Sequence, residues 1–179
     1  MIVDDNKLVN ETLSGKIESF GLIVEKYQKV VFNLAFRMTN DYDVAKDITQ
    51  ESFIKAFFKL NSFNSKYKFF SWLYRIALNE CFDFQKKQNK NENDENEIYD
   101  SGNTPLEEIE EVELKNKVNK AINMLDEKYK SVIILKHFEN LSYEEISEIL
   151  LLPIKVIKSR LYMAREILRL SLGDFFNER

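Results

Sequence analysis

The sequence has few of the residues that end helices, link segments covalently or cross membranes. Its 179 residues include only 4 glycines and 2 prolines, and so few turn residues favour long helices over many short strands. The single cysteine, Cys81, cannot form a disulfide within the chain, and its apolar neighbours predict burial. The longest apolar runs are far shorter than a membrane span, and no basic segment follows Met1 as in a signal peptide. We therefore expect an all-α, cytoplasmic protein with no membrane contact of its own.

The chain also lacks the residue clusters from which catalytic and metal sites are usually built. Its only histidine, His137, lies in an apolar segment far from Cys81 in the sequence, and we expect it to pack rather than to bind a ligand. No nucleophile has a base beside it, and no group of ligands offers an open coordination site. The sequence thus predicts no enzyme, no catalytic residue, no cofactor and no metal.

The charge of the chain is divided unevenly along its length. The net charge is −4, but every charged residue between 91 and 113 is acidic, while the segment 62–90 is mainly basic. The overall charge is therefore a poor guide to nucleic-acid binding. Residues 89–102 are rich in Asn, Asp and Glu, which predicts a solvated, flexible linker. We expect two small helical domains, at 1–90 and 106–179, joined by an acidic linker at 91–105.

The N-terminal domain is predicted to contain three helices. Apolar residues from Ile17 to Met38 recur at spacings of three and four, which indicates one long helix. A second helix is expected at 42–60, and a third from about Phe69 to about residue 87. The second helix carries an acid and amide face whose carboxylates could in principle bind a metal, although nothing around them arranges a site. This face consists of Asp43, Asp47, Gln50 and Glu51.

The third predicted helix has a basic and aromatic surface that suits single-stranded nucleic acid. Its core stripe begins at Phe70 and Leu73, and at about 100° per residue Trp72 falls on the opposite side. Bases stack on aromatic rings while Lys and Arg neutralise phosphates. The alternative, which composition alone favours, is that Trp72 packs on a neighbouring helix and the cations are simply solvated. The candidate surface comprises Lys66, Lys68, Phe69, Trp72, Arg75, Asn79 and Lys86.

The C-terminal domain has the sequence layout of a helix-turn-helix. A helix is expected at 106–125, and another from the candidate N-cap Asp126 to about residue 138. Ser142 followed by Glu145 forms a capping box for a short helix that ends at 150. Pro153 suits the first turn of a last helix, which we expect Gly173 to end. A short capped helix followed by a longer one is typical of DNA-binding helix pairs.

The last predicted helix has an apolar stripe and a basic face. The stripe runs through Ile157, Leu161 and Ala164, and the basic side chains repeat on the other side at spacings of three and four. Such a face can offer cations to phosphates and donors to base edges in a major groove. A solvated basic face on an ordinary bundle helix is about equally common on this evidence alone. The candidate surface comprises Lys155, Lys158, Ser159, Arg160, Tyr162 and Arg165.

Four segments in this order resemble one known family. Residues 43–53 (DVAKDITQESF) and 70–79 (FSWLYRIALN) are similar to core-binding and promoter-melting segments of bacterial RNA polymerase sigma factors. Residues 141–146 (LSYEEI) and 158–165 (KSRLYMAR) are similar to their helix-turn-helix that recognises the −35 element. With two domains and no middle domain, the chain resembles the extracytoplasmic-function (ECF) group of the sigma-70 family.

The resemblance implies partners and residue roles. It implies that 1–90 binds the β′ clamp helices of core RNA polymerase through Asp47, Gln50 and Glu51, and captures the single-stranded −10 element. It implies that 106–179 binds the β flap and duplex −35 DNA, and that an anti-sigma factor holds the free protein. Asn79 is the residue we expect to face a flipped base, because an amide can recognise a base edge beside a stacking surface.

The sequence departs from the family pattern at a few positions. Leu151 stands where many members have Gly in the helix-turn-helix break, so a positive φ there would be strained. Lys155 and Val156 replace a common Gly-Thr, Met163 replaces a frequent basic residue, and Lys46 replaces a frequent acid. These departures bear on the promoter sequence more than on the function.

Two other classes of helix-turn-helix protein fit less of this pattern. A dimeric helix-turn-helix repressor or activator would leave the faces around Asp47 and Trp72 without a role. A recombinase would need a nucleophile and an arginine cluster, and the N-terminal domain has only Arg37 and Arg75.

Overall fold

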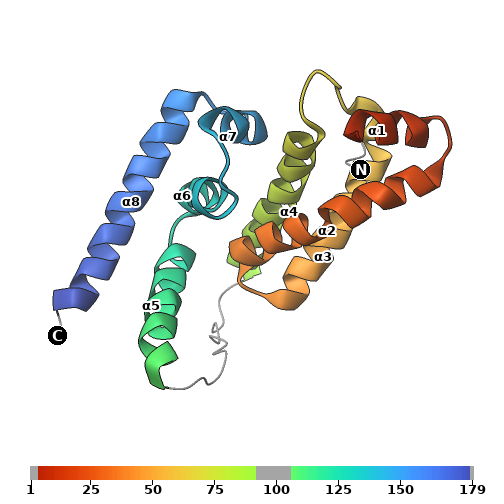
Figure 1. Cartoon of the computed structure of the whole chain (residues 1–179). Coiled ribbons are helices and arrows are strands. Elements are labelled where there is room, and N and C mark those ends of the chain that lie inside the picture. Colours follow the sequence, from red (N-terminus) through yellow and green to blue (C-terminus); the bar gives the residue numbers. More distant parts are fainter. Residues whose placement is uncertain (1–3, 92–105, 178–179) are drawn as a thin grey trace.

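A computed structural model describes the backbone of residues 4–91 and 106–177, and these segments contain helices and no strand (Figure 1). The N-terminal domain holds α1 (Asp5–Leu13), α2 (Ile17–Thr39), α3 (Tyr42–Phe58), a 3-10 turn η1 (Leu60–Ser62) and α4 (Phe69–Asn91). The C-terminal domain holds α5 (Leu106–Asn123), α6 (Glu127–Ile133), a π-helical turn η2 (Ile134–Phe138), α7 (Tyr143–Leu150) and α8 (Ile154–Asn177). The all-α fold in two helical domains is as predicted, and the expected linker lies, except for Asn91, outside the described residues.

Polar caps fix where the helices begin and end. The Asp41 carboxylate accepts a hydrogen bond of 2.9 Å from Val44 N at the start of α3, and Asn40, in the left-handed region at φ 56°, ends α2. The predicted capping box is present at α7, with Ser142 and Glu145 each accepting from the other's backbone N–H. Asp126 stands at the N-cap of α6, but its side chain makes no capping hydrogen bond. Local sequence therefore sets most helix limits.

The structure differs from the predicted helices at two places. Helix α1, for which no prediction was made, begins after the N-cap Asp4, whose carboxylate accepts from Asn6 N. Gly173 does not end α8, which continues to Asn177. A glycine costs a helix interior only about 1 kcal/mol, which is too little to stop a helix that is already packed.

The buried residues of the two domains form one continuous core. The N-terminal part centres on α2 and α4, with Ile23, Leu34 and Leu73 fully buried, and Cys81 is also buried as predicted. Burial raises the pKa of the Cys81 thiol to about 12. In the C-terminal part, Ile134, Ile146 and Ile157 join α6, η2, α7 and α8. The domains meet where α4 packs on α7 and α2 packs on η2.

A buried lysine from the C-terminal domain satisfies a carbonyl of the N-terminal domain. Lys130 in α6 is 4% exposed, and its Nζ donates to Met38 O at 2.7 Å. Gln85 Nε2 of α4 donates to the same oxygen at 3.1 Å. Carbonyls in the last turn of a helix have no partner within it, and the partial negative charge there favours a cation. The end of α2 is thus completed by side chains from both domains.

Candidate nucleic-acid and polymerase interfaces

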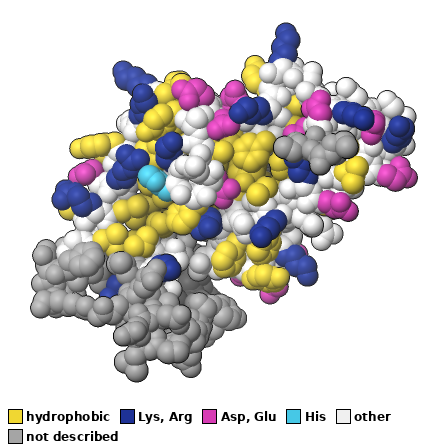
Figure 2. All heavy atoms as spheres, in the orientation of Figure 1, with side chains coloured by type: hydrophobic (Ala, Val, Ile, Leu, Met, Phe, Trp, Pro, Cys, Tyr) yellow, Lys and Arg dark blue, Asp and Glu magenta, His cyan; other side chains and the backbone are white. Residues whose placement is uncertain are grey.

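Helix α8 presents its basic face to solvent. Lys155, Lys158, Ser159, Tyr162 and Arg165 are exposed and Arg160 is half-buried, whereas Ile157, Leu161 and Ala164 are buried in the core. Figure 2 shows basic side chains over this side of the molecule, on the left of the view. The two-faced helix predicted from the sequence is therefore confirmed, while its contact with DNA stays a prediction.

The turn before α8 contains the strained residue that the sequence suggested. Leu151 has φ 53° and is 67% exposed, and its N–H bonds to Ser147 O. The Ser147 hydroxyl donates to Leu152 O at 2.6 Å. A non-glycine residue in the left-handed region costs about 1 kcal/mol or more. The turn thus keeps a helix-turn-helix geometry at the expense of some stability.

His137 is exposed beside the basic face, so the expectation that it packs in an apolar helix was wrong. Its Nε2 lies 3.2 Å from Nη2 of Arg165. Partial burial, and then the charges of Arg165 and Lys136, lower the pKa of His137. A neutral imidazole can accept a hydrogen bond from the Arg165 guanidinium and does not repel its positive charge. The contact with His137 therefore orients Arg165 on this face.

The start of α4 is more enclosed than the sequence suggested. Arg75 is half-buried, and the other polar members of the predicted surface are exposed, namely Lys66, Lys68, Asn79 and Lys86. The expectation that Trp72 and Phe69 belong to an exposed surface was wrong, because they are 8% and 2% exposed. Phe63 folds back on both, with ring centroids 5.6 Å from Trp72 and 5.3 Å from Phe69. The helical period placed Trp72 opposite the core stripe, but the loop before α4 covers that side.

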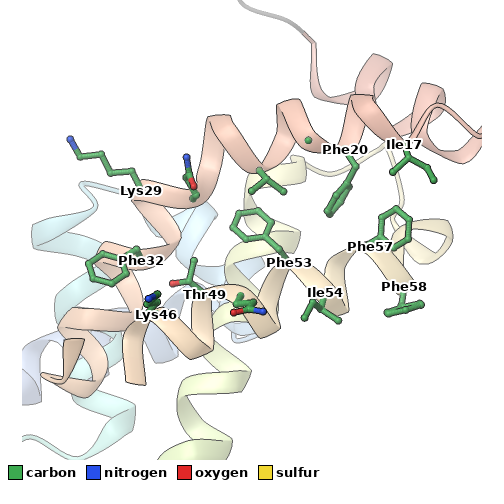
Figure 3. Close-up of a pocket in the computed structure, with 14 residues that line it drawn as sticks. Ile17, Phe20, Lys29, Phe32, Lys46, Thr49, Phe53, Ile54, Phe57 and Phe58 are labelled. Carbon is green, nitrogen blue, oxygen red and sulfur yellow. The ribbon is translucent and has the colours of Figure 1, made fainter. Parts of the chain in front are cut away.

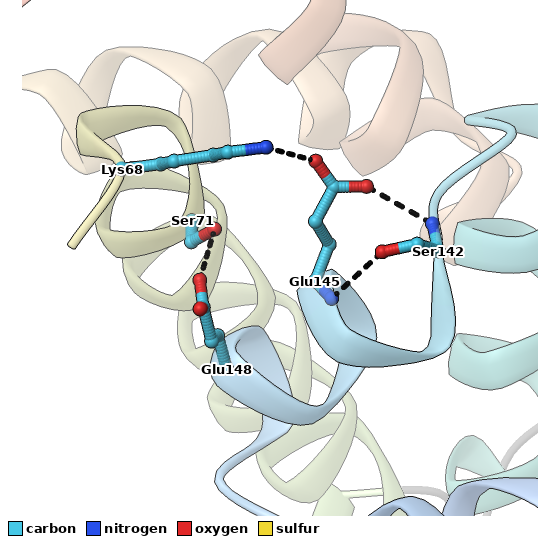
Figure 4. Close-up of polar contacts among 5 residues, drawn as sticks. All are labelled: Lys68, Ser71, Ser142, Glu145 and Glu148. Carbon is cyan, nitrogen blue, oxygen red and sulfur yellow. Dashed lines mark hydrogen bonds and ion pairs between the residues drawn. The ribbon is translucent and has the colours of Figure 1, made fainter.

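Helix α7 lies directly against the first turns of α4 (Figure 4). Lys68 Nζ lies 2.7 Å from Glu145 Oε1, and the Ser71 hydroxyl donates to Glu148 Oε2 at 3.2 Å. The hydrogen bond from Lys68, and next that from the Ser142 backbone, lower the pKa of Glu145. One carboxylate therefore serves the capping box of α7 and the contact between domains.

One turn further on, the buried Tyr74 hydroxyl donates to Glu139 at 2.7 Å. Burial, and then the charge of Glu139, raise the pKa of Tyr74. Arg37 of α2 stacks on Phe138, with its guanidinium carbon 4.2 Å from the ring centroid. These contacts extend the domain interface along α4 and α2.

The acid and amide face of α3 is exposed, as its spacing predicted. Asp43, Asp47, Gln50 and Glu51 are exposed, and Glu51 lies 3.6 Å from Lys55. Beside it runs an apolar groove of about 920 Å³ between α2 and α3 (Figure 3). In the described part of the chain, no three acidic, His or Cys side chains gather as a metal site would require. Gln50 belongs both to this face and to the lining of the groove, whose floor is mainly aromatic and whose charged lining side chains are Lys29 and Lys46.

The groove and the domain interface are the surfaces that sequence reasoning missed. The groove could have been found from Ile54, Phe57 and Phe58, which fall off the core stripe of α3 and are 36–77% exposed. Glu145 gave no such signal, because its place in the sequence is explained by the α7 cap, and Glu148 looks like any carboxylate on an exposed helix face. Among the described residues, no helix has the length and apolar character needed to cross a lipid bilayer.

Comparison with known proteins assigns both domains. Residues 23–91 match the model of "Sigma-70 region 2" and residues 115–168 that of "Sigma-70, region 4". The chain belongs to the sigma-70 family, in its ECF group. It is 33% identical to the ECF RNA polymerase sigma factor SigW of Bacillus subtilis, over 94% of this chain and 96% of that protein. It is 36% identical to the ECF RNA polymerase sigma-E factor of Haemophilus influenzae, over 92% and 93% of the two chains.

Solved structures agree with the fold. CnrH, solved in complex with the cytosolic domain of CnrY, superposes with a TM-score of 0.72 at 24% identity, covering 95% of this chain and 97% of that one. The sigma factor RpoE of Bartonella quintana, solved with the anti-sigma factor NepR, gives 0.68 at 24% identity, covering 87% and 98%. At this identity the likeness concerns the fold. Family membership identifies the chain as an RNA polymerase sigma factor that directs transcription.

Proposed function

We propose that this sigma factor acts in the cytoplasm and catalyses no covalent reaction. It binds core RNA polymerase through the exposed face of α3, and it binds promoter DNA through one surface on α4 and another on α8. The observation that carries the proposal is the exposed basic face of α8 behind the capped helix α7, in the same chain as the exposed acid and amide face of α3. A repressor that acted without polymerase would have no use for the second face.

Residues 1–90 form the proposed polymerase-binding and −10 domain. The carboxylates of Asp43, Asp47 and Glu51, with the Gln50 amide, are assigned to the β′ clamp helices. This assignment is supported by the exposure of these side chains and by the adjoining groove of aromatic side chains. A rim of charge around an apolar floor is typical of a protein interface.

The surface of α4 and the loop before it is assigned to the melted −10 strand. Lys66, Lys68, Arg75 and Lys86 supply cations for phosphates, and Asn79 offers its amide to a flipped base. Because Phe69 and Trp72 are buried, we assign them to support this surface rather than to stack openly on bases.

Residues 106–179 form the proposed −35 domain, carried by the β flap. Lys158 and Tyr162 are assigned to base edges, and Lys155, Ser159, Arg160 and Arg165 to phosphates. Residues 91–105 would connect the domains through the polymerase. An anti-sigma factor is proposed as the partner of the free chain, as the similar structure of RpoE with its anti-sigma factor NepR suggests.

The test is transcription by core RNA polymerase with the purified chain, on fragmented DNA from the source organism, with the start sites mapped. We expect discrete new starts that share two upstream elements about two DNA turns apart. Polymerase binding without new starts would reject the DNA assignments, and a folded chain that does not bind polymerase would reject the α3 assignment.

A further inference from the structure

The free chain places acidic side chains on the surface proposed for the −10 strand. Glu145 Oε1 lies 2.7 Å from Lys68 Nζ, and Glu148 Oε2 accepts from the Ser71 hydroxyl, as Figure 4 shows. A phosphodiester oxygen would use these same ammonium and hydroxyl donors. The first turn of a helix also attracts anions through its unpaired N–H groups. The two carboxylates thus occupy a position that suits two phosphates of a nucleic-acid strand.

The ion pair between α7 and the start of α4 adds little to the stability of the domain interface. The Lys68 side chain is 66% exposed and that of Glu145 is 24% exposed, and exposed ion pairs contribute little net stability. Lys130, which bonds to Met38 O, regains its hydration when the domains part, because a buried cation loses solvation. The α7 capping box does not depend on the contact, so α7 stays folded when it leaves α4.

We propose that the free sigma factor is closed, and that Glu145 and Glu148 of α7 compete with the −10 strand for the first turns of α4. This inference rests on the proposed function, which assigns α4 to single-stranded DNA. In the closed state Lys68 neutralises a carboxylate of its own chain, so strand capture has to displace α7. The apparent DNA affinity of the free chain is lowered by the fraction that is closed.

The closed state can be measured without DNA. Fluorescent dyes on the full chain with Asn61→Cys and Met124→Cys report the separation of the domains, since both sites are exposed and the native Cys81 is buried. We expect Glu145→Gln with Glu148→Gln to lower energy transfer at 0.1 M salt. The matched control, Glu25→Gln with Glu144→Gln, removes two exposed carboxylates outside the contact and should leave energy transfer unchanged. Equal transfer in the double variant and its control would mean that Glu145 and Glu148 do not hold α7 on α4, and would overturn the proposal.

Competition is measured with a fluorescein-labelled, single-stranded DNA of random sequence and 12 nucleotides. By fluorescence anisotropy, the Glu145→Gln, Glu148→Gln chain should bind about tenfold more tightly than the parent, and the control chain no more than about twofold. If the domains of the Glu145→Gln, Glu148→Gln chain separate but its DNA affinity rises no more than that of the control chain, the carboxylates do not compete with DNA, and the proposal is overturned. Opening with no DNA binding in any chain would instead reject the assignment of α4 to the strand, and with it the competition.

Discussion

Helices α4 and α8, the two proposed to contact promoter DNA, differ in how much of their surface the free chain exposes. The basic residues of α8 face solvent, whereas the first turns of α4 lie under α7 and two of their donors are bonded to its carboxylates. Both helices carry similar cations, so the difference lies in what packs beside them. On the proposed assignments, the face meant for duplex DNA is accessible in the free chain, whereas the surface meant for the −10 strand becomes accessible only when the domains part.

The buried lysine between the domains gives the largest expected effect. Burial lowers the pKa of Lys130 to about 8 from its ordinary 10.5. The unfolded chain then holds more protons than the folded chain between pH 8 and 10.5, so the contribution of Lys130 to stability rises with pH across that window. One pKa unit corresponds to about 1.36 kcal/mol. In urea titrations, the difference in free energy of unfolding between the parent and Lys130→Met should therefore rise by roughly 2–3 kcal/mol from pH 8 to pH 10.5.

The control for this titration is Lys128→Met, which removes an exposed lysine from the same helix. The free energy of unfolding of this variant, measured over the same pH range, is the reference with which Lys130→Met is compared. A flat difference for Lys130→Met would mean that water reaches the Lys130 ammonium, and that the domains are open in solution.

A charge reversal tests the exposed helix. Lys155→Glu, at an exposed position assigned to a phosphate, should weaken binding to a random-sequence DNA duplex by about 30-fold and reduce the salt dependence by about one phosphate contact. Lys7→Glu, which reverses one exposed lysine in α1, should change duplex affinity by less than about threefold. Equal losses in the two variants would mean that only net charge, and not the face of α8, attracts DNA.

The exposed amide of α4 should recognise one promoter position. Asn79→Ala is expected to cost about 1.5 kcal/mol at a single −10 base and nothing at its neighbours. Competition transcription on promoters that carry each base at each −10 position measures this. An unchanged −10 preference would remove Asn79 from base recognition.

The strained turn before α8 gives the smallest effect. Leu151→Gly should raise the free energy of unfolding by about 0.5–1 kcal/mol, because glycine adopts a positive φ without a steric penalty. Asn140→Gly, at φ 54°, is the control and should gain less, since Asn tolerates this conformation. A loss of stability in Leu151→Gly would show that the Leu151 side chain contributes more than its backbone costs.

Local patterns predicted the helices well and the contacts between them poorly. The stripe from Ile17 to Met38 and the Ser142 capping box depend on neighbours within four residues, and both are present. Trp72 was misplaced because Phe63, from a loop with no periodic pattern, covers it. Glu148 could not be assigned to Ser71, 77 positions away, because a carboxylate on an exposed helix face has many equivalent explanations.

The π-helical turn η2 determines which side chains of the C-terminal domain contact α2 and α4 of the N-terminal domain. Such a turn accommodates one more residue than a regular helix, and a residue advances the helix by about 100°. Deletion of one residue within Ile134–Phe138 would leave the sequences of α6 and α7 unchanged. Phe138 would then point away from Arg37, and Glu139 would point away from Tyr74. A single-codon deletion at this turn would therefore be a switch between coupled and independent domains, with no change in the charge of either DNA-facing helix.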